Sequence, residues 1–273
     1  MRTITYSRNG THPTKVTTAL LLAAGSGTRL QPLTLDSPKC LTEVGGIPIL
    51  ERLVNNLRAQ GFERLIVVIG HLGDRIKEFL QQNAGGLRID YIVNPVYRTT
   101  NNIYSLWLAR QQIREPFLLV ESDVIFEANM LDDMLQPDKI AISRIRPWMN
   151  GTTVELGAKR RVMAFHLSGV SGDNTRQYKT VNLYSVSLHS WNKIEESLSQ
   201  YVSEGRLGEF YEVVLAEMVA DGILCFDAVF FDADRWYEID TQTDLDAAEI
   251  LFAQCPSIVS PPLRITTPTA IRA

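Results

Sequence analysis

The chain has few cysteines and no long apolar segment, and each of these features excludes a class of protein. Its three cysteines, Cys40, Cys225 and Cys255, are widely spaced and odd in number. They suit neither a disulfide framework nor a cysteine-ligated metal site, so reduced thiols in a cytoplasmic protein are expected. No apolar run approaches the length needed to span a bilayer, so membrane insertion is not expected. The four histidines also lack the spacing of metal ligands.

A concentration of positive charge is missing too. The net charge is −4, and lysines and arginines are dispersed along the chain, so nucleic acid is not an expected partner. With 273 residues, 45% of them hydrophobic, the chain can bury a substantial core. We expect a polar tail over 1–15, one domain over 16–255 and a proline-interrupted tail over 256–273.

The order of apolar runs predicts an α/β fold with a doubly wound, mostly parallel, Rossmann-like sheet. Later runs, joined by turns, predict an inserted antiparallel region at about 145–186 over the active site. Strands are expected at 16–22, 65–69, 87–93, 117–120, 139–145, 152–156, 161–167, 178–186 and 236–240, and helices near 49–60, 74–81, 102–111, 191–202, 209–219 and from about 243.

A loop of small residues follows the first expected strand, at 23–27. Small residues let backbone N–H groups approach an anion, and Arg29 and Lys39 supply positive charge at fixed reach. If only the pair Gly25 and Gly27 is considered, a tight turn that binds no ligand is the alternative interpretation. Leu30 replaces the third glycine of the dinucleotide fingerprint, which disfavours a nicotinamide oxidoreductase, and the Gly-Lys-Ser/Thr of a P-loop is absent.

The longer pattern resembles the nucleotidyltransferase superfamily that activates sugar phosphates and small phosphorylated headgroups. One segment, 101–105, is similar to cytidylyltransferases of this superfamily that act on phosphocholine or aminoethylphosphonate. The matching residues are Leu22-Ala23-Ala24-Gly25, Gly27, Arg29, Pro32, Pro38-Lys39, Gly70-His71, Asn101-Asn102-Ile103-Tyr104-Ser105, Glu121-Ser122-Asp123 and Trp236-Tyr237-Glu238-Ile239-Asp240-Thr241.

The resemblance implies a set of roles. Mg²⁺ would be bound by Asp123 and Asp240, each of which could instead simply cap a turn or helix. Strand alternation places Glu238 on the same face as Asp240, and two carboxylates on one face repel unless a cation lies between them. The catalytic residues implied are Arg29, Lys39 and Lys179, and the nucleotide-binding residues are Leu22, Ala23, Ala24, Gly25, Ser26, Gly27, Thr28, Arg29, Gly70, His71, Asn102 and Ser105.

The expected reaction transfers CMP from CTP to a small phosphorylated or phosphonate headgroup and releases pyrophosphate. Trp148, Tyr184 and Glu238 are the expected acceptor-binding residues. Phosphocholine enzymes place a tryptophan just before the inserted strand, where this chain has Thr152, and this departure favours 2-aminoethylphosphonate over phosphocholine. The alternatives are a sugar-1-phosphate nucleotidyltransferase using UTP, dTTP or GTP, and a catalytically silent nucleotide-binding regulatory protein. The resemblance is also compatible with a homodimer.

Overall fold

The structure is a computed structural model that describes residues 15–167 and 176–252. The tail expected over 1–15, apart from Lys15, and the tail expected over 256–273 lie outside the described residues, as does Cys255. In the described part of the chain, no helix is long and apolar enough to cross a membrane.

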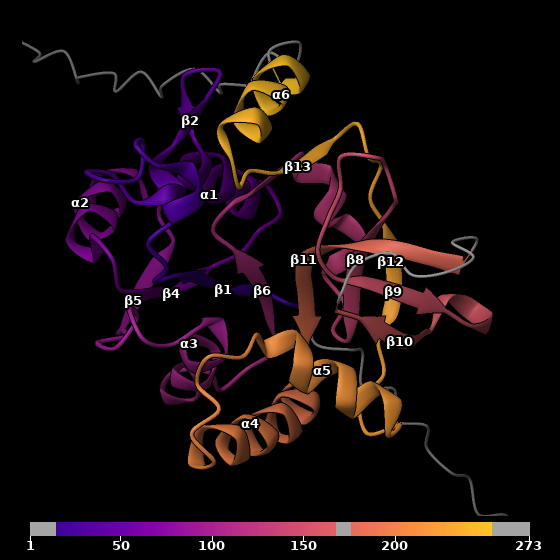
Figure 1. Cartoon of the computed structure of the whole chain (residues 1–273). Coiled ribbons are helices and arrows are strands. Elements are labelled where there is room, and N and C mark those ends of the chain that lie inside the picture. The colour runs from indigo at the N-terminus through magenta and orange to yellow at the C-terminus, as the bar shows by residue number, and fades with distance from the viewer. Residues whose placement is uncertain (1–14, 168–175, 253–273) are drawn as a thin grey trace, which may run out of the picture.

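A nine-stranded mixed sheet forms the centre of the molecule (Figure 1). Four strands, in the order β6-β1-β4-β5, are parallel to one another. Each of β1 and β4 is buried along its full length, as expected for strands covered on both faces. The bounds are β1 Thr18–Ala23, β4 Arg64–Ile69, β5 Arg88–Val93 and β6 Phe117–Glu121.

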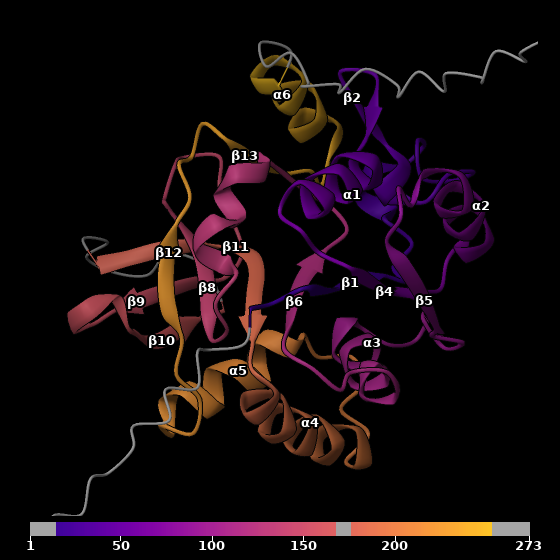
Figure 2. The ribbon, with the colours of Figure 1, turned by 180° about the vertical axis from the view of Figure 1, so that it is seen from behind.

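Helices cover both faces of these strands, which confirms the predicted α/β fold with a mostly parallel sheet. Helices α1 and α2 lie on one face, and α3, α4 and α5 lie on the other (Figures 1 and 2). The buried positions of α1 recur at helical spacing, with Leu50, Leu53, Val54 and Leu57 facing the core. The bounds are α1 Ile49–Ala59, α2 Gly73–Asn83, α3 Asn102–Leu108, α4 Leu188–Ser203, α5 Tyr211–Ala220 and α6 Gln242–Phe252.

The antiparallel region continues the central sheet on the far side of β6. Strand β11 pairs antiparallel with β6, β8 and β9, and β9 pairs with β10. Strand β12 pairs parallel with β8; the sequence pattern did not predict it, because its four residues are too few for a clear periodicity. The bounds are β8 Lys139–Arg144, β9 Thr153–Leu156, β10 Val162–His166, β11 Gln177–Val186 and β12 Asp227–Phe230.

Two short antiparallel pairs lie outside the large sheet. The first joins β2, Glu43–Val44, to β3, Ile47–Pro48. The second joins β7, Val124–Phe126, to β13, Trp236–Glu238. The second pair brings the end of the described chain back to the carboxyl end of β6, which is the edge of an open α/β sheet where ligands bind.

Candidate active site

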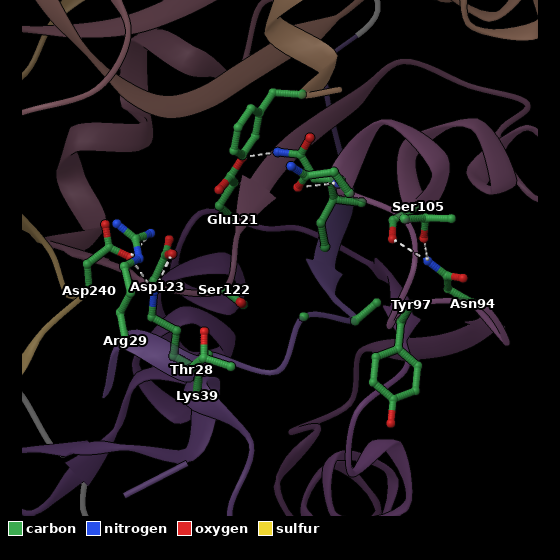
Figure 3. A pocket seen from close by; sticks show the side chains of 18 residues that line it. Thr28, Arg29, Lys39, Asn94, Tyr97, Ser105, Glu121, Ser122, Asp123 and Asp240 are labelled. Carbon is green, nitrogen blue, oxygen red and sulfur yellow. Dashed lines mark hydrogen bonds and ion pairs between the residues drawn. The ribbon is translucent and has the colours of Figure 1, made fainter. Parts of the chain in front are cut away.

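A cavity of about 320 Å³ opens at the carboxyl ends of β1, β5 and β6. It receives residues from the glycine loop, from the start of α3 and from the turns after β6 and β13. Figure 3 shows four charged side chains, Arg29, Lys39, Asp123 and Asp240, gathered on one side and Asn94, Tyr97 and Ser105 on the opposite side. The remaining lining residues are Leu22, Ala24, Gly25, Gly27, Thr28, Thr100, Asn101, Asn102, Glu121, Ser122 and Phe210.

The glycine loop has one position that only glycine suits. Gly27 has a φ of 60°, and a Cβ placed there would lie 3.1 Å from Thr34 and 3.2 Å from the Cβ of Lys39. The Thr34 hydroxyl donates a hydrogen bond of 2.8 Å to the carbonyl of Gly27. Because the loop packs this closely on Lys39, the loop conformation fixes the position of the lysine.

The charged side chains form one connected group. The Nζ atom of Lys39 donates to Asp123 Oδ2 and to Asp240 Oδ1, both at 2.7 Å, and Arg29 donates to Asp240 Oδ1 at 2.7 Å. Lys39, Asp123 and Asp240 are largely buried, whereas Arg29 is exposed. Burial lowers the pKa of the Lys39 ammonium, but attraction to Asp123 and Asp240 outweighs burial and leaves the pKa raised. Lys39 is therefore fully charged at neutral pH.

The pairing of β7 with β13 brings the two aspartates together. Glu238 lies opposite Val124 in this pair, and the backbone N–H of Ile239 donates to the carbonyl of Asp123 at 2.9 Å. The segment then enters α6, where Asp244 Oδ2 accepts from the backbone N–H of Thr241 at 2.8 Å. Asp240 is thus held at the start of α6. Asp123 and Asp240, which are 117 residues apart in the sequence, both contact the ammonium of Lys39.

The two aspartates fit a divalent cation. Their oxygens already bind a single positive atom, Lys39 Nζ, and Asp123 Oδ1 is buried without a hydrogen-bond partner in the described structure. In the described ranges no group of three or more His, Cys, Asp or Glu side chains has metal-binding geometry. Mg²⁺ suits such a site, because it is usually bound by one or two carboxylates together with water and substrate phosphates.

The opposite side of the cavity carries neutral hydrogen-bonding groups. Asn94, which follows β5 and is 1% exposed, donates through Nδ2 to Ser105 Oγ at 3.1 Å and to Thr100 Oγ1 at 3.2 Å. Its Oδ1 accepts from the backbone N–H of Val96. Asn94 therefore fixes the hydroxyl groups of two residues that line the cavity. The general rule that ligands bind at the carboxyl ends of strands could have identified Asn94, but the resemblance did not include it.

A second acidic group consists of Glu121, which lines the cavity, and Glu212, which lies outside the lining. Glu121 Oε1 accepts from Asn102 Nδ2 at 3.2 Å, and Asn102 Oδ1 accepts from the backbone N–H of Tyr211 at 3.0 Å. Glu212 follows Tyr211 and is 6% exposed. Burial raises the pKa of Glu212 to about 7, and burial together with Glu212 and Asp123 raises the pKa of Glu121 well above its usual range. Sequence reasoning missed Glu212, which carries no local motif.

Lys179 and Glu238 form an ion pair beside this group. Lys179 Nζ lies 3.1 Å from Glu238 Oε2 and donates to the carbonyl of Thr180 at 2.7 Å. Asn182 Nδ2 donates to Glu238 Oε1 at 3.0 Å. Burial raises the pKa of Glu238, although attraction to Lys179 opposes this. In this structure Lys179, expected at the phosphates, instead neutralises Glu238.

Several predicted residues lie outside the cavity lining. Tyr184 is fully buried against Tyr211 and Phe226, so its side chain belongs to the core and does not line the cavity. Trp148 stacks on Tyr237 at 4.2 Å between ring centroids, which turns its ring toward β13. The other predicted residues outside the lining are Ala23, Ser26, Gly70, His71, Lys179 and Glu238.

Gly70 and His71 support the loop from behind. The backbone N–H of His71 donates to the carbonyl of Ala24 at 3.0 Å, and a Cβ on Gly70 would lie 2.6 Å from the same carbonyl and 2.8 Å from Tyr97. These two residues therefore position the glycine loop without lining the cavity. Burial raises the pKa of the Cys40 thiol, next to Lys39, to about 12, so this thiol is a packing group.

Relatives of the chain include two proteins named for CMP or cytidylyl transfer and a UTP–glucose-1-phosphate uridylyltransferase. The chain is 30% identical over 253 residues to the CMP-5′-(3-aminopropyl)phosphonate synthase of Streptomyces rubellomurinus. The matched region covers 86% of this chain but only 38% of that protein. It is 25% identical over 228 residues to the choline-phosphate cytidylyltransferase of Streptococcus pneumoniae, covering 83% of this chain and 94% of that one.

Solved structures show the same fold. A CTP:phosphocholine cytidylyltransferase from Streptococcus pneumoniae superposes with a TM-score of 0.75 at 21% identity, covering 87% of this chain and 99% of that one. An inositol-1-phosphate CTP transferase from T. maritima superposes with a TM-score of 0.72 at 21% identity, covering 88% of this chain and 96% of that one. The sequence profile of the MobA-like NTP transferase domain matches residues 19–173, and the chain belongs to this family.

Proposed function

We propose that the protein is a Mg²⁺-dependent cytidylyltransferase that transfers CMP from CTP to a small phosphorylated or phosphonate headgroup. The observation that carries the proposal is the junction of Arg29 and Lys39 with Asp123 and Asp240 at the glycine loop, in one cavity. Two cations and two carboxylates beside a glycine-containing backbone loop suit a nucleoside triphosphate with its metal. Family membership and the two cytidylyltransferase relatives support the same reaction.

In the proposed reaction an oxygen of the acceptor attacks the α-phosphorus of CTP. The new oxygen–phosphorus bond forms as the bond from the α-phosphorus to the bridging oxygen breaks, and pyrophosphate leaves. The acceptor is already largely anionic near neutral pH, since a phosphate monoester has a second pKa of about 6. No residue is then needed as a nucleophile or general base, and catalysis consists of positioning and charge neutralisation.

The residues of the cavity have different roles in the proposed reaction. Arg29 and Lys39 bind the triphosphate and neutralise the charge that develops on the leaving pyrophosphate. Asp123 and Asp240 hold Mg²⁺, which supplies charge neutralisation at the phosphates. The hydroxyl groups of Ser105 and Thr100, which Asn94 orients, form hydrogen bonds with the pyrimidine. Ser105 lies on the cavity side opposite the charges (Figure 3).

Pyrophosphate release with Mg²⁺ tests the proposal. CTP, UTP, GTP, ATP and dTTP are each combined with 2-aminoethylphosphonate, phosphocholine, glycerol 3-phosphate and several sugar 1-phosphates. Release with CTP and a headgroup acceptor is the expected result. Activity with a sugar 1-phosphate alone would overturn the acceptor class. Nucleotide binding without turnover on any acceptor would favour the regulatory alternative.

A further inference from the structure

The segment that follows the glycine loop has an inverted burial pattern. Leu33 and Leu35 are 44% and 54% exposed, whereas Thr34, which lies between them, is only 1% exposed. Hydrophobicity alone would bury the two leucines and leave the threonine in water, because a hydroxyl group loses its hydration when it is buried. The fold therefore leaves apolar surface in water here and places one hydroxyl group inside, against the glycine loop.

The buried hydroxyl group of Thr34 binds a carbonyl of the loop. It donates to the carbonyl oxygen of Gly27 at 2.8 Å, and the same oxygen accepts from the backbone N–H of Leu30 at 3.0 Å. A carbonyl oxygen has two lone pairs, so these two donors fill its acceptor capacity. Gly27 lines the cavity, and its partially negative oxygen would repel a phosphate if it turned toward one. Thr34 keeps this oxygen on a protein donor instead.

His71, which follows β4, links Thr34 to the start of the loop. Its ring Nε2 lies 3.3 Å from the carbonyl oxygen of Thr34, and its backbone N–H donates to the carbonyl oxygen of Ala24 at 3.0 Å. Because a carbonyl oxygen only accepts, Nε2 carries the ring proton in this contact. Two carbonyls of the loop, those of Ala24 and Gly27, are thus bound by donors from residues outside the cavity lining.

We propose that Thr34 and His71 are positioning residues for the phosphates of the nucleotide. They keep the loop carbonyls on protein donors, so that the backbone N–H groups of the loop and Lys39 face the phosphates. The link to Lys39 is close, because a Cβ on Gly27 would lie only 3.2 Å from the Cβ of Lys39. Thr34 and His71 act through the loop and do not touch the phosphates. This inference rests on the proposed function, because it concerns the phosphate end of the same cavity.

Replacement of Thr34 by valine removes the donor and keeps the methyl group that lies against Gly27. Calorimetry with Mg²⁺ should give a Kd for CTP that is about 3- to 10-fold above wild type, the range for loss of one neutral hydrogen bond. The Kd for pyrophosphate, which has no base or ribose, should rise by the same factor. The KM for the acceptor, measured by pyrophosphate release, should stay at the wild-type value.

Conservative variants test whether the donors themselves matter. Thr34→Ser keeps the hydroxyl group and should restore both Kd values. His71→Leu should raise the same two Kd values, whereas His71→Gln, which keeps an N–H donor, should raise them less. A merely structural role for either side chain would not give this order.

Thr18→Val is the matched control. Thr18 is also a buried threonine, and its hydroxyl group donates to Glu115 at 2.7 Å, at the end of β1 away from the cavity. This variant should have a lower Tm than wild type but wild-type Kd values for CTP and pyrophosphate. It therefore separates a loss of stability from a loss of loop position.

The outcomes distinguish this inference from the proposed function. Wild-type Kd values in Thr34→Val overturn the inference, as does a rise for CTP without a rise for pyrophosphate, or a loss in Thr34→Ser as large as in Thr34→Val. A wild-type protein that binds CTP and pyrophosphate but transfers no CMP overturns the proposed function, and the two Kd values of the variants still decide the inference. A wild-type protein that binds neither compound overturns both.

Discussion

Replacement of Lys39 by methionine tests the charged centre of the site most directly. The Nζ atom of Lys39 binds Asp123 and Asp240 at 2.7 Å each, and its side chain is 11% exposed while those of the aspartates are 13% and 8% exposed. Methionine keeps much of the volume and removes the charge. The two carboxylates then lie close together without the lysine charge between them. Arg29, which contacts Asp240, is the cation that remains beside them.

The expected loss of stability is large for a single polar substitution. Removing one partner of a buried ion pair costs about 3–5 kcal/mol, because the remaining charge stays buried without compensation. In a protein of this size 1 kcal/mol corresponds to roughly 2–4 °C in Tm, so we expect a fall of about 10 °C. Since Lys39 occupies the point that the two carboxylates share, Mg²⁺ without nucleotide should stabilise Lys39→Met more than wild type. Mass action at about 100 times the Kd supplies roughly 2.7 kcal/mol.

Thermal unfolding with and without Mg²⁺ measures both effects. Lys77→Met is the matched control, because Lys77 forms an exposed pair with Asp74 at 3.0 Å, and such pairs contribute about 1 kcal/mol or less. CTP turnover should fall by about 10²- to 10³-fold in Lys39→Met, as for loss of one preorganised donor. A wild-type Tm together with wild-type turnover would refute the assignment of Lys39 to the charged centre.

Three further substitutions probe other parts of the site. Asp123→Asn should remove nearly all turnover and weaken Mg²⁺ binding measured by calorimetry, while circular dichroism stays that of the wild type; substantial remaining activity would exclude Asp123 as a metal ligand. Gly70→Ala places a Cβ 2.6 Å from the carbonyl of Ala24 and 2.8 Å from Tyr97, so the loop must shift and the Kd for CTP should rise about 10-fold or more, whereas an unchanged Kd would show that the loop adapts. Glu212 has a folded pKa of about 7 against 4.5 for an ordinary glutamate, so the folded state binds the extra proton and stability falls as pH rises from 4.5 through 7. Glu212→Gln should remove that fall, which is worth about 3 kcal/mol by pH 8; chemical denaturation at pH 5 and pH 8 measures it, and an identical pH slope in the two proteins would contradict the raised pKa.

The parallel half of the fold was predictable from sequence because its signals are local. The apolar runs at 16–22 and 65–69 correspond to β1 and β4, and the spacing of Leu50, Leu53 and Leu57 corresponds to α1. The antiparallel strands were also predicted, but their pairing with the central sheet was not. They extend the central sheet through the pairing of β11 with β6, and pairing between distant strands leaves no periodic pattern in either one.

The residues that line the glycine-loop end of the cavity were more predictable than those at the opposite end. Arg29, Lys39 and the glycine loop lie in one short segment, and Asp123 and Asp240 each follow a strand. Their convergence in one cavity agrees with the general rule for open α/β sheets. Tyr184 and Trp148 were expected at the acceptor because aromatic residues bind cations, yet the structure uses Tyr184 to fill the core and stacks Trp148 on Tyr237.

The contacts of the acidic residues explain why the sequence alone could not describe the end of the cavity opposite the glycine loop. At the glycine-loop end Asp123 and Asp240 both contact Lys39, a residue of the family pattern, so the sequence could name both as candidates. At the other end Lys179 pairs with Glu238, and burial raises the pKa of both Glu121 and Glu212. Asn102 joins these two glutamates although it lies 109 residues from the Tyr211 backbone that it binds. Contacts between segments so far apart in sequence are a property of the folded chain and leave no motif in the sequence.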